Sequence, residues 1–122
     1  MTERRLKSGP GWRLGWDPQA ECYCGLVGND DWAIELTAAE LDEFCQLFGQ
    51  LAASMAQMAT ELMAAERLYC EAEGEFLWLE VEGFPHAYEL RLIVNAGRRA
   101  EGAWVASAVP GLLAATQTLR VF

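Results

Sequence analysis

The chain has 122 residues, of which 52% are hydrophobic and 22% are charged, a composition typical of one folded domain (residues 1–122) and not of a disordered segment. It lacks the run of roughly 18 apolar residues that a membrane-spanning helix needs, and no apolar stretch follows the basic N-terminal residues, so we expect no membrane span, no secretory signal and a cytoplasmic location. The net charge of −9 is unevenly distributed, because residues 1–16 hold four basic residues and one acidic, and the remaining chain holds five basic residues and 17 acidic.

The first part of the chain predicts short strands. "RRLKS" alternates briefly, and the stretch "GPGWRLGWDP" gives a second short strand between glycine and proline breakers, with the two tryptophans on one side and Arg13 on the other. A longer alternating run covers residues 20–27, and the turn "NDD" joins it to "WAIEL" as a hairpin. We expect the tryptophans to lie in the core and Arg13 to meet an acidic group of the same protein.

A long amphipathic helix follows, and it is the clearest element in the sequence. Thr37 and Glu40 have the spacing of a capping box, which predicts the first turn of the helix. No proline occurs between residues 37 and 67, so we expect a helix over about 37–67. Its apolar stripe follows spacings of three and four: Leu41, Phe44, Phe48, Leu51, Met55, Met58 and Leu62.

The length of this helix predicts a homodimer. A helix over 37–67 is about 45 Å long, whereas a compact domain of this size is only about 35 Å across. The far half of the stripe then needs cover from a second copy, and the expected interface residues are Leu51, Met55, Met58 and Leu62. The alternative is that residues 68–122 fold back and cover the whole stripe within one chain.

The second half predicts more strands and a short helix. "RLYCEAE" and "FLWLEVEG" read as strands, and the second forms a hairpin with residues 86–94 through a loop over 82–85, with Val81 opposite His86. A strand at "AEGAWVAS", a helix over about 109–117 and a closing strand "TLRVF" complete the chain. Residues 20–41 and 87–113 share an order of strand, Asn-led turn, strand with tryptophan and helix, which suggests a duplicated strands-then-helix unit.

No sequence pattern indicates catalysis or a bound cofactor. His86 is the only histidine, and no nucleophile motif accompanies it, so we expect it to stabilise a turn or pack inward. The chain has no C-x-x-C pair and no glycine-rich phosphate loop, so we expect no metal and no nucleotide. The four cysteines are expected to be buried free thiols, and the glutamates of residues 71–82 to form a solvated strand face and not a calcium loop.

Parity of the later strands leaves Phe76, Trp78 and Arg91 on an outer face, beside Glu80 and Glu89. Exposed aromatic residues on a sheet either stack single-stranded bases or are buried by a protein partner or by a covering helix of the same protein. Because the neighbours are glutamates, which repel phosphate, we favour a protein partner, with Arg13 as a further candidate contact.

The motifs "GWRLGWDP", "WAIELT", "CEAEGEFLWLEVEGFPHAYELR" and "EGAWVASAVPGLL" resemble those of a family of small cyanobacterial proteins of unknown function, from about Gly9 to Phe122. The resemblance implies a fold related to the Whirly-type single-stranded-DNA-binding regulators, with antiparallel strands followed by a helix, repeated or paired. It implies no activity and no site residues, since fold kinship does not carry function.

The sequence therefore predicts an α+β protein that acts without catalysis as a cytoplasmic binding or assembly module, with a homodimer and an unidentified protein as its partners. The alternative is a regulator that binds single-stranded nucleic acid on a Whirly-like sheet.

Overall fold

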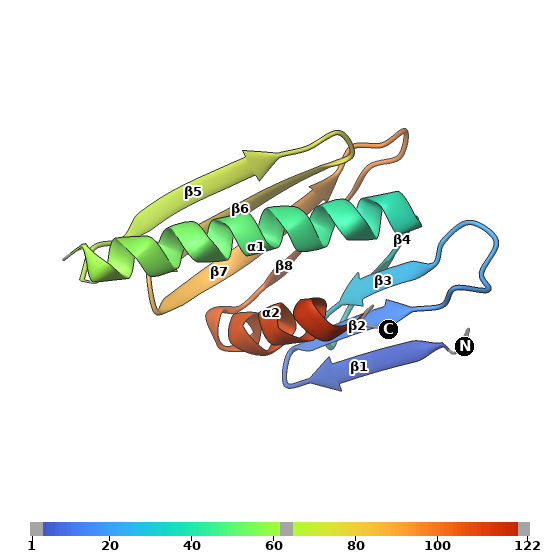
Figure 1. The fold of residues 1–122 in the computed structure, drawn as a ribbon, viewed down its shortest axis with the longest axis horizontal. Helices are drawn as coiled ribbons and strands as arrows, with labels where there is room; N and C mark the ends of the chain where they lie inside the picture. Colours follow the sequence, from blue (N-terminus) through green and yellow to red (C-terminus); the bar gives the residue numbers. More distant parts are fainter. Residues whose placement is uncertain (1–3, 62–64, 120–122) are drawn as a thin grey trace.

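The computed structural model describes residues 4–61 and 65–119, and it confirms the α+β class. Two antiparallel four-stranded sheets, with strands in sequence order, are each followed by a helix (Figure 1). The order of strands then helix thus occurs twice along the chain. The elements are β1 (Arg5–Gly9), β2 (Trp12–Trp16), β3 (Gly25–Gly28), β4 (Ala33–Leu36), α1 (Ala38–Thr60), β5 (Leu68–Glu73), β6 (Leu77–Phe84), β7 (Ala87–Val94), β8 (Ala100–Trp104), the short 3-10 helix η1 (Ala106–Ala108) and α2 (Val109–Thr118).

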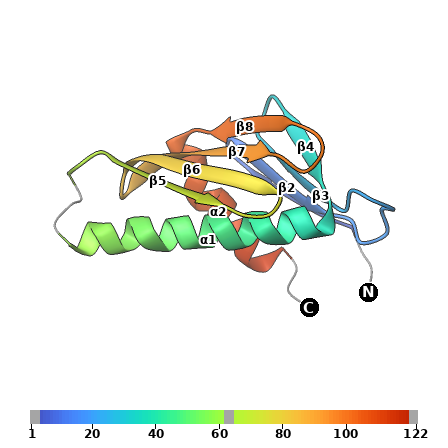
Figure 2. The same ribbon diagram turned by 90° about the horizontal axis from the view of Figure 1, so that it is seen from above.

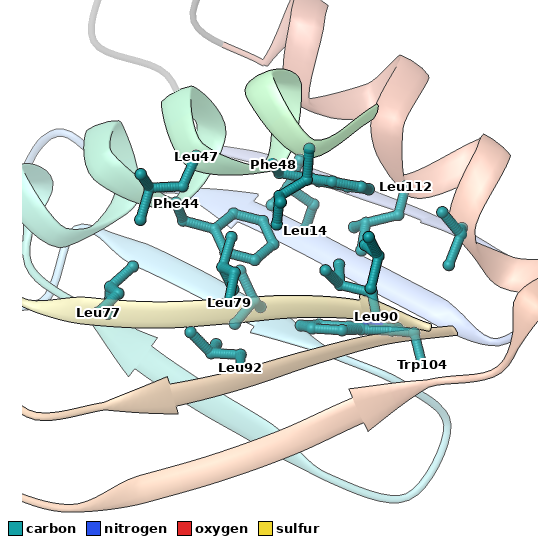
Figure 3. Packing of buried hydrophobic residues seen from close by; sticks show 14 of the residues in the cluster. Leu14, Phe44, Leu47, Phe48, Leu77, Leu79, Leu90, Leu92, Trp104 and Leu112 are labelled. Atoms are coloured by element: carbon teal, nitrogen blue, oxygen red, sulfur yellow. The ribbon is translucent and has the colours of Figure 1, made fainter. Parts of the chain in front are cut away.

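The core lies between the two helices and the inner faces of the two sheets (Figures 2 and 3). Helix α1 packs mainly on β5 and β6, and α2 packs mainly on β2. Trp104 joins the two sheets, because its indole N–H donates to the carbonyl oxygen of Gly28 at 2.8 Å and its ring lies 5.0 Å from that of Trp32. In the described part of the chain, neither helix is both long and apolar enough to cross a bilayer.

The capping box at the start of α1 is confirmed, whereas its predicted end is wrong. The Glu40 N–H donates to the Thr37 hydroxyl oxygen at 3.1 Å, and the Thr37 N–H donates to the Glu40 carboxylate at 2.9 Å. The helix ends at Thr60 and not near residue 67, because the chain must reverse before Leu68 pairs with Gly83. Its 23 residues span about 35 Å, about the width of a compact domain of this size and about 10 Å less than the predicted helix.

This shorter helix removes the reason to expect a second copy over Leu51 and Met55, and of the described interface candidates it leaves only Met58 partly exposed. Leu51 and Met55 are buried by the chain itself, with exposed fractions of 4% and 0%, as in the single-chain alternative. Met58 is half-buried, and Leu62 lies outside the described residues. The homodimer itself stays a prediction.

The β6–β7 hairpin has the predicted faces but a different turn. Val81 lies opposite Leu90 and not opposite His86, and the turn consists of Pro85 and His86 alone. The observed and predicted registers differ by an even number of residues, so the same side chains are buried in both. Proline suits the first position of a tight turn, where no amide donor is needed.

Two further expectations for the strands are wrong. The run over 20–27 forms a strand only from Gly25, because the Asp17 N–H donates to the Cys24 carbonyl oxygen at 2.7 Å and closes a loop before it. Cys22 lies in that loop and is exposed, and the other three cysteines are half-buried, so none is the fully buried thiol that was expected. At the other end, α2 continues through Thr118, and residues 120–122 of the expected closing strand lie outside the described residues.

A buried ion pair joins the start of α1 to the second sheet. Arg98, in the β7–β8 turn, donates to both carboxylate oxygens of Glu40, at 3.1 and 2.9 Å, and to the carbonyl oxygen of Glu35. The Glu40 side chain is 3% exposed, so its charge depends on this partner. Hydrogen bonding to Glu40 raises the pKa of Arg98, which keeps the guanidinium charged.

We predict that Arg98→Ala lowers the free energy of unfolding by about 3 kcal/mol, because it leaves the buried Glu40 carboxylate without its cation. Chemical denaturation followed by circular dichroism measures this loss. The matched control is Arg99→Ala, since Arg99 is the exposed neighbour, and it should change stability by less than about 0.5 kcal/mol. Equal losses in both variants would contradict this role for the ion pair.

We also predict that Met58→Glu dissociates the homodimer, because a glutamate at this half-buried position would be buried in the interface without a partner. Light scattering should then give twice the 13.5 kDa of one chain for the original sequence and 13.5 kDa for the variant. A mass of 13.5 kDa for the original sequence at micromolar concentration would exclude the dimer.

Candidate functional site

The outer face of the second sheet is the candidate site, and we call it the acidic face. It consists of the side chains that alternate with the buried Leu77, Leu79 and Val81 and their neighbours on the other strands. Both helices lie on the opposite side of this sheet (Figure 2). The residues of the acidic face are Tyr69, Glu71, Glu73, Trp78, Glu80, Glu82, Phe84, Glu89, Arg91, Ile93, Glu101 and Ala103.

Negative charge dominates this face, since six of these residues are glutamates and one is an arginine. Arg91 lies 3.6 Å from Glu80 and 3.3 Å from Glu101, so its charge is shared between two carboxylates. At the border of the sheet, Arg67 lies 3.5 Å from Glu82. The net charge of the face therefore stays negative after its internal pairing.

Two pairs of glutamates face each other directly across neighbouring strands. Glu71 is the register partner of Glu80, and Glu82 is the register partner of Glu89. Like charges in this arrangement destabilise a sheet, by a few tenths of a kcal/mol to about 1 kcal/mol for each pair. These two pairs therefore do not stabilise the fold.

Aromatic side chains lie among the carboxylates. Tyr69 is 52% exposed, and its hydroxyl donates to Glu71 at 2.8 Å. Hydrogen bonding to the carboxylates of Glu80 and Glu71 raises the pKa of Tyr69 well above its usual range. Phe84 is 40% exposed, and Trp78 is half-buried between the strands that carry Glu73 and Ile93. The face thus offers apolar contact area beside its charges.

A shallow hollow of about 80 Å³ lies near the centre of the acidic face. The carboxylates of Glu80, Glu82 and Glu89 line it, together with Leu90, Arg91 and Ala103. Among the residues that the structure describes, no group of histidine, cysteine or acidic side chains has an arrangement suited to a metal ion. The hollow instead has the chemistry to accept the hydrogen bonds of an ammonium or guanidinium group.

The structure brings only some of the predicted site residues together. Trp78 and Arg91 lie on the acidic face as expected. Phe76 precedes β6 and packs against the core, and its N–H donates to the Glu43 carboxylate at 2.8 Å. Arg13 belongs to the first sheet, where it donates to the carbonyl oxygens of Asn29 and Trp32, at 2.7 and 2.9 Å, in place of the expected acidic group.

Sequence reasoning missed Tyr69, Phe84 and the two opposed glutamate pairs. Tyr69 alternates with the half-buried residues of β5, and this alternation was sufficient to place it on the outer face. The glutamate pairs depend on the register, which parity alone does not determine. His86, expected to follow the loop and to stabilise a turn or pack inward, is exposed within the two-residue turn and lines an apolar groove with Tyr88 and Leu113.

Comparisons with known proteins identify a family but no activity. The chain matches the family described as Domain of unknown function (DUF1818) over residues 7–119, and it belongs to this family. No curated protein matches it. It is similar to a solved structure from Prochlorococcus sp. NATL2A, described as a protein with unknown function from the DUF155 family, with a TM-score of 0.90 and 27% identity over 96% of this chain and 98% of that one.

We predict that Tyr69 ionises later than a tyrosine in water, because the neutral phenol donates to carboxylates that repel the phenolate. Glu71→Gln should lower the pKa of Tyr69, because one of these carboxylates is lost while that of Glu80 stays. The folded state binds this proton more tightly than the unfolded state, so the contribution of Tyr69 to stability falls as the pH rises above about 10.

Ultraviolet titration of the phenolate absorbance between neutral and strongly alkaline pH measures this effect, and Tyr69→Phe assigns the signal. The pKa of Tyr88 is raised by burial, and this residue lies on the inner face. Its titration curve should therefore be the same in the original sequence and in Glu71→Gln. An unchanged titration of Tyr69 in Glu71→Gln would contradict the proposed contact.

Proposed function

We propose that this member of the DUF1818 family is a cytoplasmic, non-catalytic binding protein whose acidic face takes a basic segment of another protein. The observation that carries the proposal is the pair of opposed glutamate couples, Glu71 with Glu80 and Glu82 with Glu89, on a sheet face that no helix covers. A cationic partner relieves the repulsion between these glutamates, and this relief contributes to the free energy of binding.

The alternation of charge and apolar surface indicates the kind of segment. Trp78 and Ile93 are register partners, and Glu80 and Arg91 are the partners two residues further along the same strands. An extended segment with lysine or arginine at intervals, separated by apolar residues, matches such rows. Charge complementarity gives it fast association, and the exposed Tyr69 and Phe84 add apolar contact.

Other features support the location and the absence of catalysis in this proposal. All four cysteines are free thiols in the structure, as suits a reducing compartment. The one histidine of the sequence, His86, is exposed in a turn and so is not the buried, oriented base of a catalytic triad.

The expected fold kinship to Whirly-type regulators, which the comparisons do not show, makes single-stranded nucleic acid the alternative ligand. Stacking of bases on Tyr69 and Phe84 would bring phosphates against Glu82 and its neighbours. This charge disfavours phosphate at physiological salt, so a basic polypeptide is the better match.

We predict that a fluorescent peptide of alternating lysine and leucine binds the protein, and that a mixed single-stranded oligonucleotide does not. The double variant Glu82→Lys/Glu89→Lys should weaken peptide binding by about tenfold or more, because it reverses the charge at the central hollow. Fluorescence anisotropy at several salt concentrations measures both ligands.

The matched control is Asp30→Lys/Asp31→Lys, which makes the same change in net charge at exposed positions of the β3–β4 turn. It should retain most of the peptide affinity. Equal weakening in both double variants would mean that only net charge attracts the peptide, and tight, salt-sensitive oligonucleotide binding would replace the proposal by its alternative.

A further inference from the structure

A cavity of about 160 Å³ lies on the first sheet, on the face away from the core. Strand register explains its position: Leu6, Gly15, Leu26 and Glu35 are successive partners across the four strands and form one row. Gly15 leaves a gap in the middle of this row. A Cβ atom there would lie 3.3 Å from the nearest Leu6 carbon and 3.4 Å from that of Leu26, so one added carbon would already crowd these side chains and Gly15 forms a low apolar floor between them.

The loop over residues 17–24 forms one wall of the cavity, and it is held in place. The Asp17 N–H donates to the Cys24 carbonyl oxygen at 2.7 Å, and the Asp17 carboxylate accepts from the Gln19 N–H at 3.1 Å. Tyr23, which is 40% exposed, lies with its ring centre 4.9 Å from the Arg98 guanidinium. The cavity is therefore formed before any ligand binds, which reduces the entropic cost of binding.

Charges of both signs line the rim. Arg4 precedes β1 and Arg5 is its first residue, Asp17 directly follows the neighbouring strand β2, and Glu35 lies in β4 at the other edge of the sheet. The Arg5 guanidinium also donates to the Leu119 carbonyl oxygen at 3.4 Å. Because the lining charges sum to zero, a ligand with one net charge meets attraction and repulsion together, whereas a zwitterion matches both signs.

We propose that this cavity binds a free α-amino acid with an apolar side chain. The ligand carboxylate pairs with Arg4, its ammonium group pairs with Glu35, and its side chain fills the gap above Gly15 between Leu6 and Leu26. The volume fits this class, because it is below the roughly 300–1,000 Å³ of pockets for drug-sized ligands. The acidic face lies on the other sheet, so this binding is independent of the proposed protein docking.

The test is a titration of the full chain with leucine and phenylalanine, followed by NMR chemical shifts and calorimetry. We expect saturable binding, with the largest shifts at Gly15, Tyr23 and Leu26. 4-Methylpentanoate lacks the ammonium group of leucine and isopentylamine lacks its carboxylate, so each should bind at least about tenfold more weakly. Absence of saturable binding, or binding of either analogue as tight as that of leucine, would overturn the proposal.

Three variants locate the site on the protein. Gly15→Val fills the gap and Glu35→Gln removes the negative charge, so both should weaken leucine binding by about tenfold or more. Glu35→Gln preserves the fold contact of this residue, because Arg98 bonds its backbone oxygen. Gly49→Ala is the control, since its Cβ meets no atom within 4 Å, and it should bind leucine normally. Unchanged leucine affinity in Gly15→Val and Glu35→Gln would place binding elsewhere and overturn the assignment.

Discussion

The first two turns of α1 carry the interactions that hold the two strands-then-helix units together. Glu40 caps its own helix and at the same time binds Arg98 of the β7–β8 turn. Glu43, one turn later, accepts from the N–H groups of Glu75, Phe76 and Leu77 at 2.7 to 2.8 Å, which holds the β5–β6 turn. Two carboxylates on one helix thus fix two turns at the same end of the second sheet, and charged acceptors make these bonds stronger than neutral ones.

This junction decides which surfaces remain for binding. Because α1 and α2 are held against the inner faces, each sheet keeps an outer face that neither helix covers (Figure 2). The outer face of the second sheet holds opposed glutamates, and that of the first holds a cavity between the strands and a loop. Arg98 connects the junction to this cavity through Tyr23, so the residue that secures the fold also orients a wall of the site.

The sequence was informative where the determining contacts are local. The capping box lies within four residues, and the buried faces of the β6–β7 hairpin follow from alternation, so both were predictable. The end of α1 was not, because it depends on the pairing of Leu68 with Gly83 in a strand that follows. The ion pair between Glu40 and Arg98 joins residues 58 positions apart, and the glutamate pairs need a register that parity leaves open.

The uneven charge of the sequence also has a structural explanation. Lys7 donates to the Thr118 hydroxyl oxygen and Arg5 to the Leu119 carbonyl oxygen, so two cations of β1 lie at the C-terminus of α2, where the helix dipole favours positive charge. Arg13 is likewise bound to the carbonyl oxygens of the β3–β4 turn. Three of the four basic residues at the start of the chain, Arg5, Lys7 and Arg13, thus serve internal contacts. Since few cations remain for the surface, the acidic face of the second sheet keeps a net negative charge, and the proposed basic partner rests on this charge.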